Sequence, residues 1–75
     1  MMTDAEVNIM RDAYKFLNGF ADTPDLNDPG CDDYWRRASE ALSAAGNKWK
    51  MHPLAEKVLI GIFEYLEIKQ KAVSR

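Results

Sequence analysis

The sequence is poor in the residues that most catalytic and metal sites require. Its 75 residues include one cysteine, Cys31, and one histidine, His52. A single cysteine cannot form a disulfide within the chain, which is typical of a protein from a reducing compartment. One cysteine and one histidine cannot assemble a zinc site. No neighbouring residue marks the Cys31 thiol as a nucleophile activated by His52. We therefore expect no enzyme activity, no metal and no other cofactor.

Long hydrophobic runs are also missing. No apolar stretch reaches the roughly 18 residues that a membrane-spanning helix needs. The first six residues, Met-Met-Thr-Asp-Ala-Glu, lack the basic flank and apolar segment of a signal peptide. With 47% hydrophobic and 29% charged residues, the composition is that of a globular protein. We expect one cytoplasmic domain over residues 1–75, with no membrane partner.

Three apolar-periodic segments predict three helices, over residues 5–20, 32–45 and 53–71. The predicted fold class is all-α, and the predicted architecture is a three-helix antiparallel bundle. The third segment has the widest apolar side, covering roughly 220° of the helix circumference against about 100° for a helix that rests on one neighbour. We expect this helix at the centre of the fold. The predicted core consists of Met10, Tyr14, Leu17, Trp35, Ala38, Leu42, Val58, Leu59, Ile62, Phe63 and Leu66.

Residues typical of helix ends support these boundaries. Thr3 and Glu6 have the spacing of a capping box at the first helix. Gly46 and the following asparagine predict the end of the second helix. His52 stands at the N-cap position of the third helix, and Pro53 stands at its first residue, where proline is tolerated.

The first and third helices carry more apolar surface than the second helix can cover. Ile9 and Phe16 form an additional edge on the first helix, and Ile60 stands alone on the polar side of the third. A symmetric contact with a second copy would bury these residues. The leading hypothesis is a non-catalytic protein-interaction module that forms a homodimer.

The connection over residues 21–30 is rich in aspartate, proline and glycine, which predicts an irregular loop. An EF-hand alignment that starts at Asp25 puts Arg36 where a bidentate glutamate is required, so it fails. Asp25 and Asp28 belong instead to a run of carboxylates that could meet a basic surface. The second hypothesis is therefore a phage-encoded inhibitor that uses this loop to bind a host protein. Whether the segment over residues 22–33 holds a cation stays open.

A nucleic-acid interface is the third hypothesis. Trp49 lies between Lys48 and Lys50, a pattern in which a base can stack on the indole between phosphate contacts. A tryptophan in a short connection more often closes the end of a small bundle. The net charge of −2 also disfavours binding to phosphates. We therefore rank nucleic acid as an unlikely partner.

The segment over residues 49–71 contains His-Pro-Leu-Ala followed by Phe-Glu-Tyr-Leu-Glu-Ile-Lys. It resembles the end of uncharacterised short helical proteins encoded by phages and mobile elements of Gram-positive bacteria. The resemblance covers the last third of the chain. It implies a bacterial or phage setting inside the cell, and it transfers no functional residue.

Overall fold

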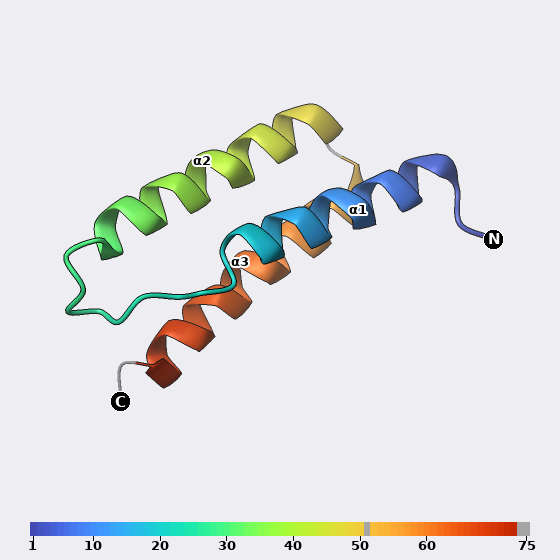
Figure 1. The fold of residues 1–75 in the computed structure, drawn as a ribbon. Coiled ribbons are helices and arrows are strands. Elements are labelled where there is room, and N and C mark those ends of the chain that lie inside the picture. Colours follow the sequence, from blue (N-terminus) through green and yellow to red (C-terminus); the bar gives the residue numbers. More distant parts are fainter. Residues whose placement is uncertain (51, 74–75) are drawn as a thin grey trace.

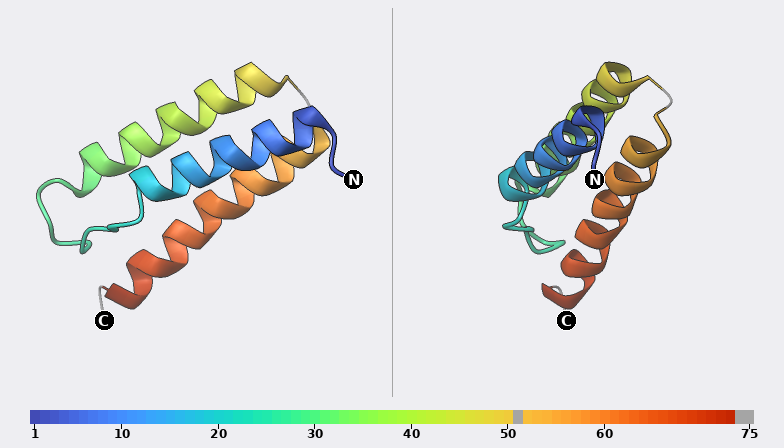
Figure 2. Two further views of the ribbon diagram at one scale, coloured as in Figure 1. Left: turned by 45° about the vertical axis from the view of Figure 1, so that its right-hand side comes forward. Right: turned by 90° about the vertical axis from the view of Figure 1, so that its right-hand side faces the viewer.

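The computed structural model describes residues 1–50 and 52–73, which form three α-helices and no β-strand. Helix α1 spans Asp4–Gly19, α2 spans Cys31–Trp49 and α3 spans Pro53–Val73 (Figure 1). α1 and α3 run in roughly the same direction, and α2 runs the opposite way (Figure 2). The prediction of an all-α, three-helix antiparallel bundle is confirmed.

The bundle is thin, and α3 holds it together. α3 packs against both other helices, whereas α1 and α2 contact each other less extensively. The Cα atoms extend over 43 × 21 × 16 Å. Because a helix with its side chains is about 10 Å across, the shortest dimension leaves room for two layers of helices at most. α1 and α3 therefore have outward sides that no other helix of the described chain covers.

The predicted caps of α1 and α3 are both formed. Thr3 N donates to Glu6 Oε1 at 2.7 Å, and Glu6 N donates to Thr3 Oγ1 at 3.2 Å, which completes the capping box. The backbone hydrogen bond from Thr3 lowers the pKa of Glu6. At α3, Leu54 N donates to His52 Nδ1 at 3.2 Å, so the imidazole satisfies an amide that the helix leaves without a partner.

The predicted end of α2 is wrong. The helix does not stop at Gly46 but continues to Trp49. Leu42, Ala45 and Trp49 follow the i, i+3, i+7 spacing of one helix side, and all three pack against the core. Continuing the helix keeps Trp49 in line with this side. That contact offsets the cost of a helical glycine, about 1 kcal/mol relative to alanine.

The core uses a different side of α1 from the one predicted. Ile9, Ala13 and Phe16 are buried, whereas Met10 is 43% exposed and Tyr14 is 72% exposed. The prediction that Met10 and Tyr14 lie in the core is therefore wrong. The small side chain of Ala13 lets α1 approach its neighbours closely, and the i, i+4, i+7 spacing of the buried residues gives a continuous line of contact.

The other predicted core residues are buried or half-buried in the bundle. Ala38, Leu59 and Leu66 are buried, and the remainder are half-buried: Leu17, Trp35, Leu42, Val58, Ile62 and Phe63. One cluster joins Ile9 and Phe16 of α1 to three residues of α3, namely Ala55, Leu59 and Leu66.

A chain of aromatic contacts extends this core across all three helices. Edge-to-face pairs run in order through Phe16, Phe20, Tyr34, Trp35 and Phe63, with ring centres 5.0–5.5 Å apart. Such pairs contribute about 0.5–1.5 kcal/mol each beyond the area that they bury. The chain begins on α1, passes through α2 and ends on α3, so it fixes the three helices relative to one another.

The register of α1 can be tested by truncating one residue of each side. Ile9→Ala should lower the free energy of unfolding by about 3 kcal/mol, because it opens a cavity in the core. Met10→Ala should change it by less than about 0.5 kcal/mol, because that side chain is largely exposed. Urea unfolding of dilute protein measures both. Equal losses for the two variants would contradict the observed register.

Candidate functional site

A polar cluster of Asp12, Lys48 and Trp49 joins α1 to the last turn of α2. Asp12 Oδ2 accepts a hydrogen bond from Lys48 Nζ at 2.8 Å and another from Trp49 Nε1 at 2.9 Å. Lys48 Nζ also lies 5.3 Å from the centre of the Trp49 ring. The hydrogen bond from Lys48 lowers the pKa of Asp12, and the bond from Trp49 adds to this, while partial burial acts in the opposite direction.

The cluster bears on the predicted stacking role of Trp49. This residue is the last of α2 instead of part of a connection, and its half-buried ring packs against the core. Its N–H group is held by Asp12, and the neighbouring Lys48 is paired with the same carboxylate. These contacts are those of a residue that closes the end of a bundle.

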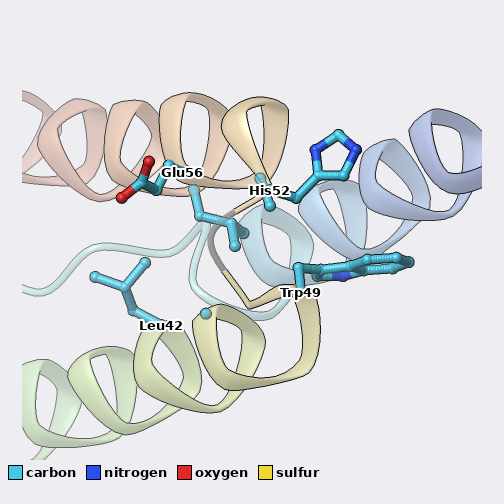
Figure 3. Close-up of a pocket in the computed structure, with 7 residues that line it drawn as sticks. Leu42, Trp49, His52 and Glu56 are labelled. Carbon is cyan, nitrogen blue, oxygen red and sulfur yellow. The ribbon is translucent and has the colours of Figure 1, made fainter.

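A cleft of about 110 Å³ lies between α2 and α3 beside Trp49 (Figure 3). It is lined by Leu42, Gly46, Trp49, His52, Ala55, Glu56 and Leu59. Ligand pockets usually have volumes of roughly 300–1,000 Å³, so this cleft is too small for a typical metabolite. In Figure 3 the carboxylate of Glu56 and the imidazole of His52 point away from each other, so they do not form an acid–base pair.

A wider hollow of about 370 Å³ lies between the start of α2 and the end of α3. Its lining consists of Leu26, Trp35, Phe63, Glu67, Gln70 and Lys71. The rings of Trp35 and Phe63 lie in edge contact, 5.4 Å apart. Glu67 and Lys71 carry opposite charges, so the hollow has no net charge with which to select an ion.

The loop between α1 and α2 is anchored from both sides. Tyr34 Oη donates to the carbonyl of Phe20 at 2.6 Å, and Lys69 Nζ donates to the carbonyl of Ala21 at 2.5 Å. Gln70 Nε2 lies 3.3 Å from the carbonyl of Pro24 and 3.1 Å from Cys31 Sγ, to both of which it donates. The only cysteine is therefore a buried group in a loop anchor.

The carboxylates predicted to act in this loop take part in its turns. Asp25 Oδ1 accepts from Asn27 N at 2.8 Å, and Asp28 Oδ1 accepts from Gly30 N at 2.7 Å. Such contacts are those of Asx turns, which shape a loop locally. Among the described residues, no group of three or more His, Cys, Asp or Glu side chains could hold a metal ion.

Exposed large apolar side chains are concentrated on α1 and α3. α1 exposes Val7, Met10 and Tyr14, and α3 exposes Ile60, Tyr65, Ile68 and Val73. α2 exposes none of this kind. Its outer side carries ion pairs instead, in which Asp33 binds Arg36 and Arg37, and Arg36 also reaches Glu40. The large apolar side chains that the helices expose therefore belong to α1 and α3.

Five of these residues lie on one side of the bundle and form what we call the outer face: Val7, Met10, Tyr14, Tyr65 and Ile68. At 100° per residue, Met10 lies across the buried line of α1 from Asp12, which contacts α2. Tyr65 likewise lies across the buried line of α3 from Phe63, which contacts Trp35 of α2. Met10 and Tyr65 therefore lie beside the seam between α1 and α3, on the side that turns away from α2.

The prediction that Ile9 and Phe16 form an interaction edge is wrong. Ile9 is fully buried and Phe16 is 8% exposed, so they do not form an exposed apolar edge of α1. Both belong to the core because Ile9, Ala13 and Phe16 form the line along which α1 meets α3. Ile60 is 49% exposed, and its role in an interaction stays a prediction.

The outer face was hidden in the sequence because α1 has two apolar stripes. Val7, Met10 and Tyr14 form one stripe, and Ile9 and Phe16 form the other. Both stripes have the spacing of one side of a helix. One signal distinguishes the two stripes. Ala13 lies in the stripe of Ile9 and Phe16, where a small residue allows a close helix contact. On α3, the wide apolar side indicated a surface in excess of what two neighbours cover, and Tyr65 and Ile68 are that excess.

The comparisons with known proteins give no match from which a function could be transferred. No protein-family model matches it, and neither a curated protein nor a solved structure does. Within the described residues, no helix is both long enough and apolar enough to cross a membrane.

The Asp12 cluster makes stability depend on pH. The pKa of Asp12 is lower in the folded chain than its ordinary value of 3.8. Its contribution is therefore complete above that value and is lost as the pH falls through the lowered one. Asp12→Asn should cost about 1 kcal/mol at pH 7, because it removes the charge that Lys48 pairs with. The difference from the wild type should vanish at the acidic end of a urea-unfolding series.

A double-mutant cycle with Lys48→Met provides the control. If Asp12 acts through Lys48, the loss caused by Asp12→Asn should be smaller when Lys48 is already absent. An unchanged loss at every pH, or full additivity of the two substitutions, would show that the pair does not stabilise the fold.

Proposed function

We propose that this chain is a small helical protein-interaction module, without catalytic activity of its own, that forms a homodimer through the outer face. The observation that carries the proposal is the uneven distribution of exposed apolar side chains, which occur on α1 and α3 and are replaced by ion pairs on α2. Scattered surface apolar residues are ordinary, whereas a group of them gathered on one side of two adjacent helices, as five of these are, is typical of an interface.

The total accessible surface area supports the proposal that a second molecule covers part of the chain. The accessible area is 5455 Å² for a mass of 8.6 kDa. A compact monomer of this mass is expected to expose about 4,700 Å², roughly 750 Å² less. Each partner in a standard protein–protein interface buries roughly 800 Å². The excess surface is therefore about the amount that one contact with another molecule would cover.

The shape supports the same proposal. The radius of gyration is 13.3 Å, against about 11.4 Å for a compact domain of 75 residues. The core of a chain of this length rarely supplies more than about 3–5 kcal/mol of stability, and oligomerisation is one of the usual supplements. With a net charge of −2, two copies of the chain repel each other only weakly.

The positions of the reactive side chains fit a role without catalysis. Cys31 begins α2, whereas His52 follows its end. A helix of 19 residues is about 28 Å long, so the two side chains lie at opposite ends of the bundle. His52 Nδ1 already accepts the hydrogen bond that caps α3, and Cys31 Sγ accepts one from Gln70.

Light scattering after size exclusion, at two well-separated protein concentrations, tests the homodimer. The wild type should have twice the mass of 8.6 kDa at the higher concentration. Tyr14→Glu should raise the dissociation constant at least tenfold, because it places a carboxylate in an apolar interface. A monomeric wild type, or a Tyr14→Glu variant that associates normally, would refute the proposal.

The matched control is Ser43→Glu, which adds the same charge to an exposed position on α2. It should leave the mass unchanged, because α2 lies away from the outer face. Circular dichroism should show the wild-type helix content for both variants, since Tyr14 is largely exposed and its replacement removes little core contact.

A further inference from the structure

Gly61 is a residue that the packing of the single chain does not explain. It lies in the middle of α3, where glycine is among the least favourable residues. A Cβ atom added to it would meet no atom within 4 Å, so no neighbour inside the bundle requires the absence of a side chain. The position is exposed and opens outward.

A shallow hollow surrounds this glycine on the outside of the molecule. It has a volume of about 380 Å³ and is lined by Glu56, Lys57, Ile60, Gly61 and Glu64. All five residues are exposed. Ile60, which sequence reasoning assigned to an interaction, forms one edge of the hollow. The hollow therefore combines a missing side chain with an exposed apolar rim.

Helical spacing places Gly61 on the outer face. Leu54, Gly61 and Ile68 follow one another at intervals of seven residues and form a nearly straight row along α3. Tyr65 lies beside this row toward α1, on the same side as the exposed stripe of that helix. A helix that approached Gly61 from outside would find the outer face on one flank and the hollow on the other.

The charges beside the row favour one orientation of an approaching copy. Lys57 and Glu64 lie on opposite ends of the hollow, and neither is ion-paired within the described chain. If α3 crosses a second α3 antiparallel at Gly61, Lys57 of each copy faces Glu64 of the other. The same crossing places Leu54 opposite Ile68. A parallel crossing would instead oppose like charges.

We propose that α3 packs antiparallel against α3 of a second copy, with the two-fold axis passing at Gly61. This inference rests on the proposed homodimer and specifies its contact. The absence of a side chain at Gly61 lets the helix axes come close, since the distance between packed helices depends on the side chains at the crossing. The α1 stripes of the two copies then lie against each other beside the central pair.

A pair of glycine substitutions tests the crossing point. Gly61→Ala should raise the dissociation constant of the dimer at least tenfold, because each methyl group meets the other at the axis. Gly46→Ala is the matched control. A Cβ atom added to Gly46 would also meet no atom within 4 Å, but Gly46 lies on α2, away from the proposed contact. Both variants should unfold at a temperature a few degrees higher as monomers, because alanine favours helix. Sedimentation equilibrium gives the dissociation constants.

Charge reversal tests the orientation. Lys57→Glu alone and Glu64→Lys alone should each weaken association several-fold, and the double variant should restore it to within about twofold, because the pairs reform between copies. A double variant that is weaker than either single one would overturn the antiparallel arrangement.

The outcomes separate this inference from the homodimer itself. A dimeric wild type that Tyr14→Glu dissociates, but that Gly61→Ala and the charge reversals leave unchanged, would overturn the crossing at Gly61 and leave the homodimer standing. A wild type that is monomeric throughout would overturn both. Loss of association in Gly61→Ala, with Gly46→Ala unaffected, supports the crossing.

Discussion

The burial of Ile9 and Phe16 against Ala55, Leu59 and Leu66 is the contact on which the rest of the structure depends. It decides which side of α1 faces inward. Once this line is buried, the second apolar stripe of α1 must face solvent, because the two stripes lie on different sides of one helix. The outer face is therefore a direct consequence of how the core is packed, and the same contact that stabilises the monomer leaves apolar surface outside it.

Local signals in the sequence are enough to predict the three helices and the caps of α1 and α3. The Thr3–Glu6 pair and the His52–Pro53 pair work within one helical turn, so their chemistry can be read from neighbouring residues. The rotation of α1 about its axis could not be read in this way. Both stripes have helical spacing, and the choice between them depends on how the rings and methyl groups fit against α3. Periodicity alone therefore assigns Met10 and Tyr14 of the second stripe to the core.

The end of α2 was misjudged for a related reason. Gly46 is a sound local stop signal, but Asp12 lies 37 residues from Trp49 and accepts its N–H group. Lys69 and Gln70 likewise bind carbonyls that precede them by 46 to 48 residues. Contacts of this range stabilise both ends of the bundle, and no periodic pattern within a segment encodes them. The contacts of Lys69 and Gln70 also hold the Asp-rich loop in its position.

Geometry explains why α3 has more apolar surface than its two neighbours cover. Covering a helix by one neighbour takes an apolar arc of about 100°. In a triangular bundle, the directions from one helix to its two neighbours differ by about 60°. Two arcs of about 100° with this offset cover roughly 160° of the helix circumference. The apolar arc of α3, at roughly 220°, exceeds this by about 60°. Tyr65 and Ile68 fill that remainder, which a helix of the second copy covers in the proposed homodimer.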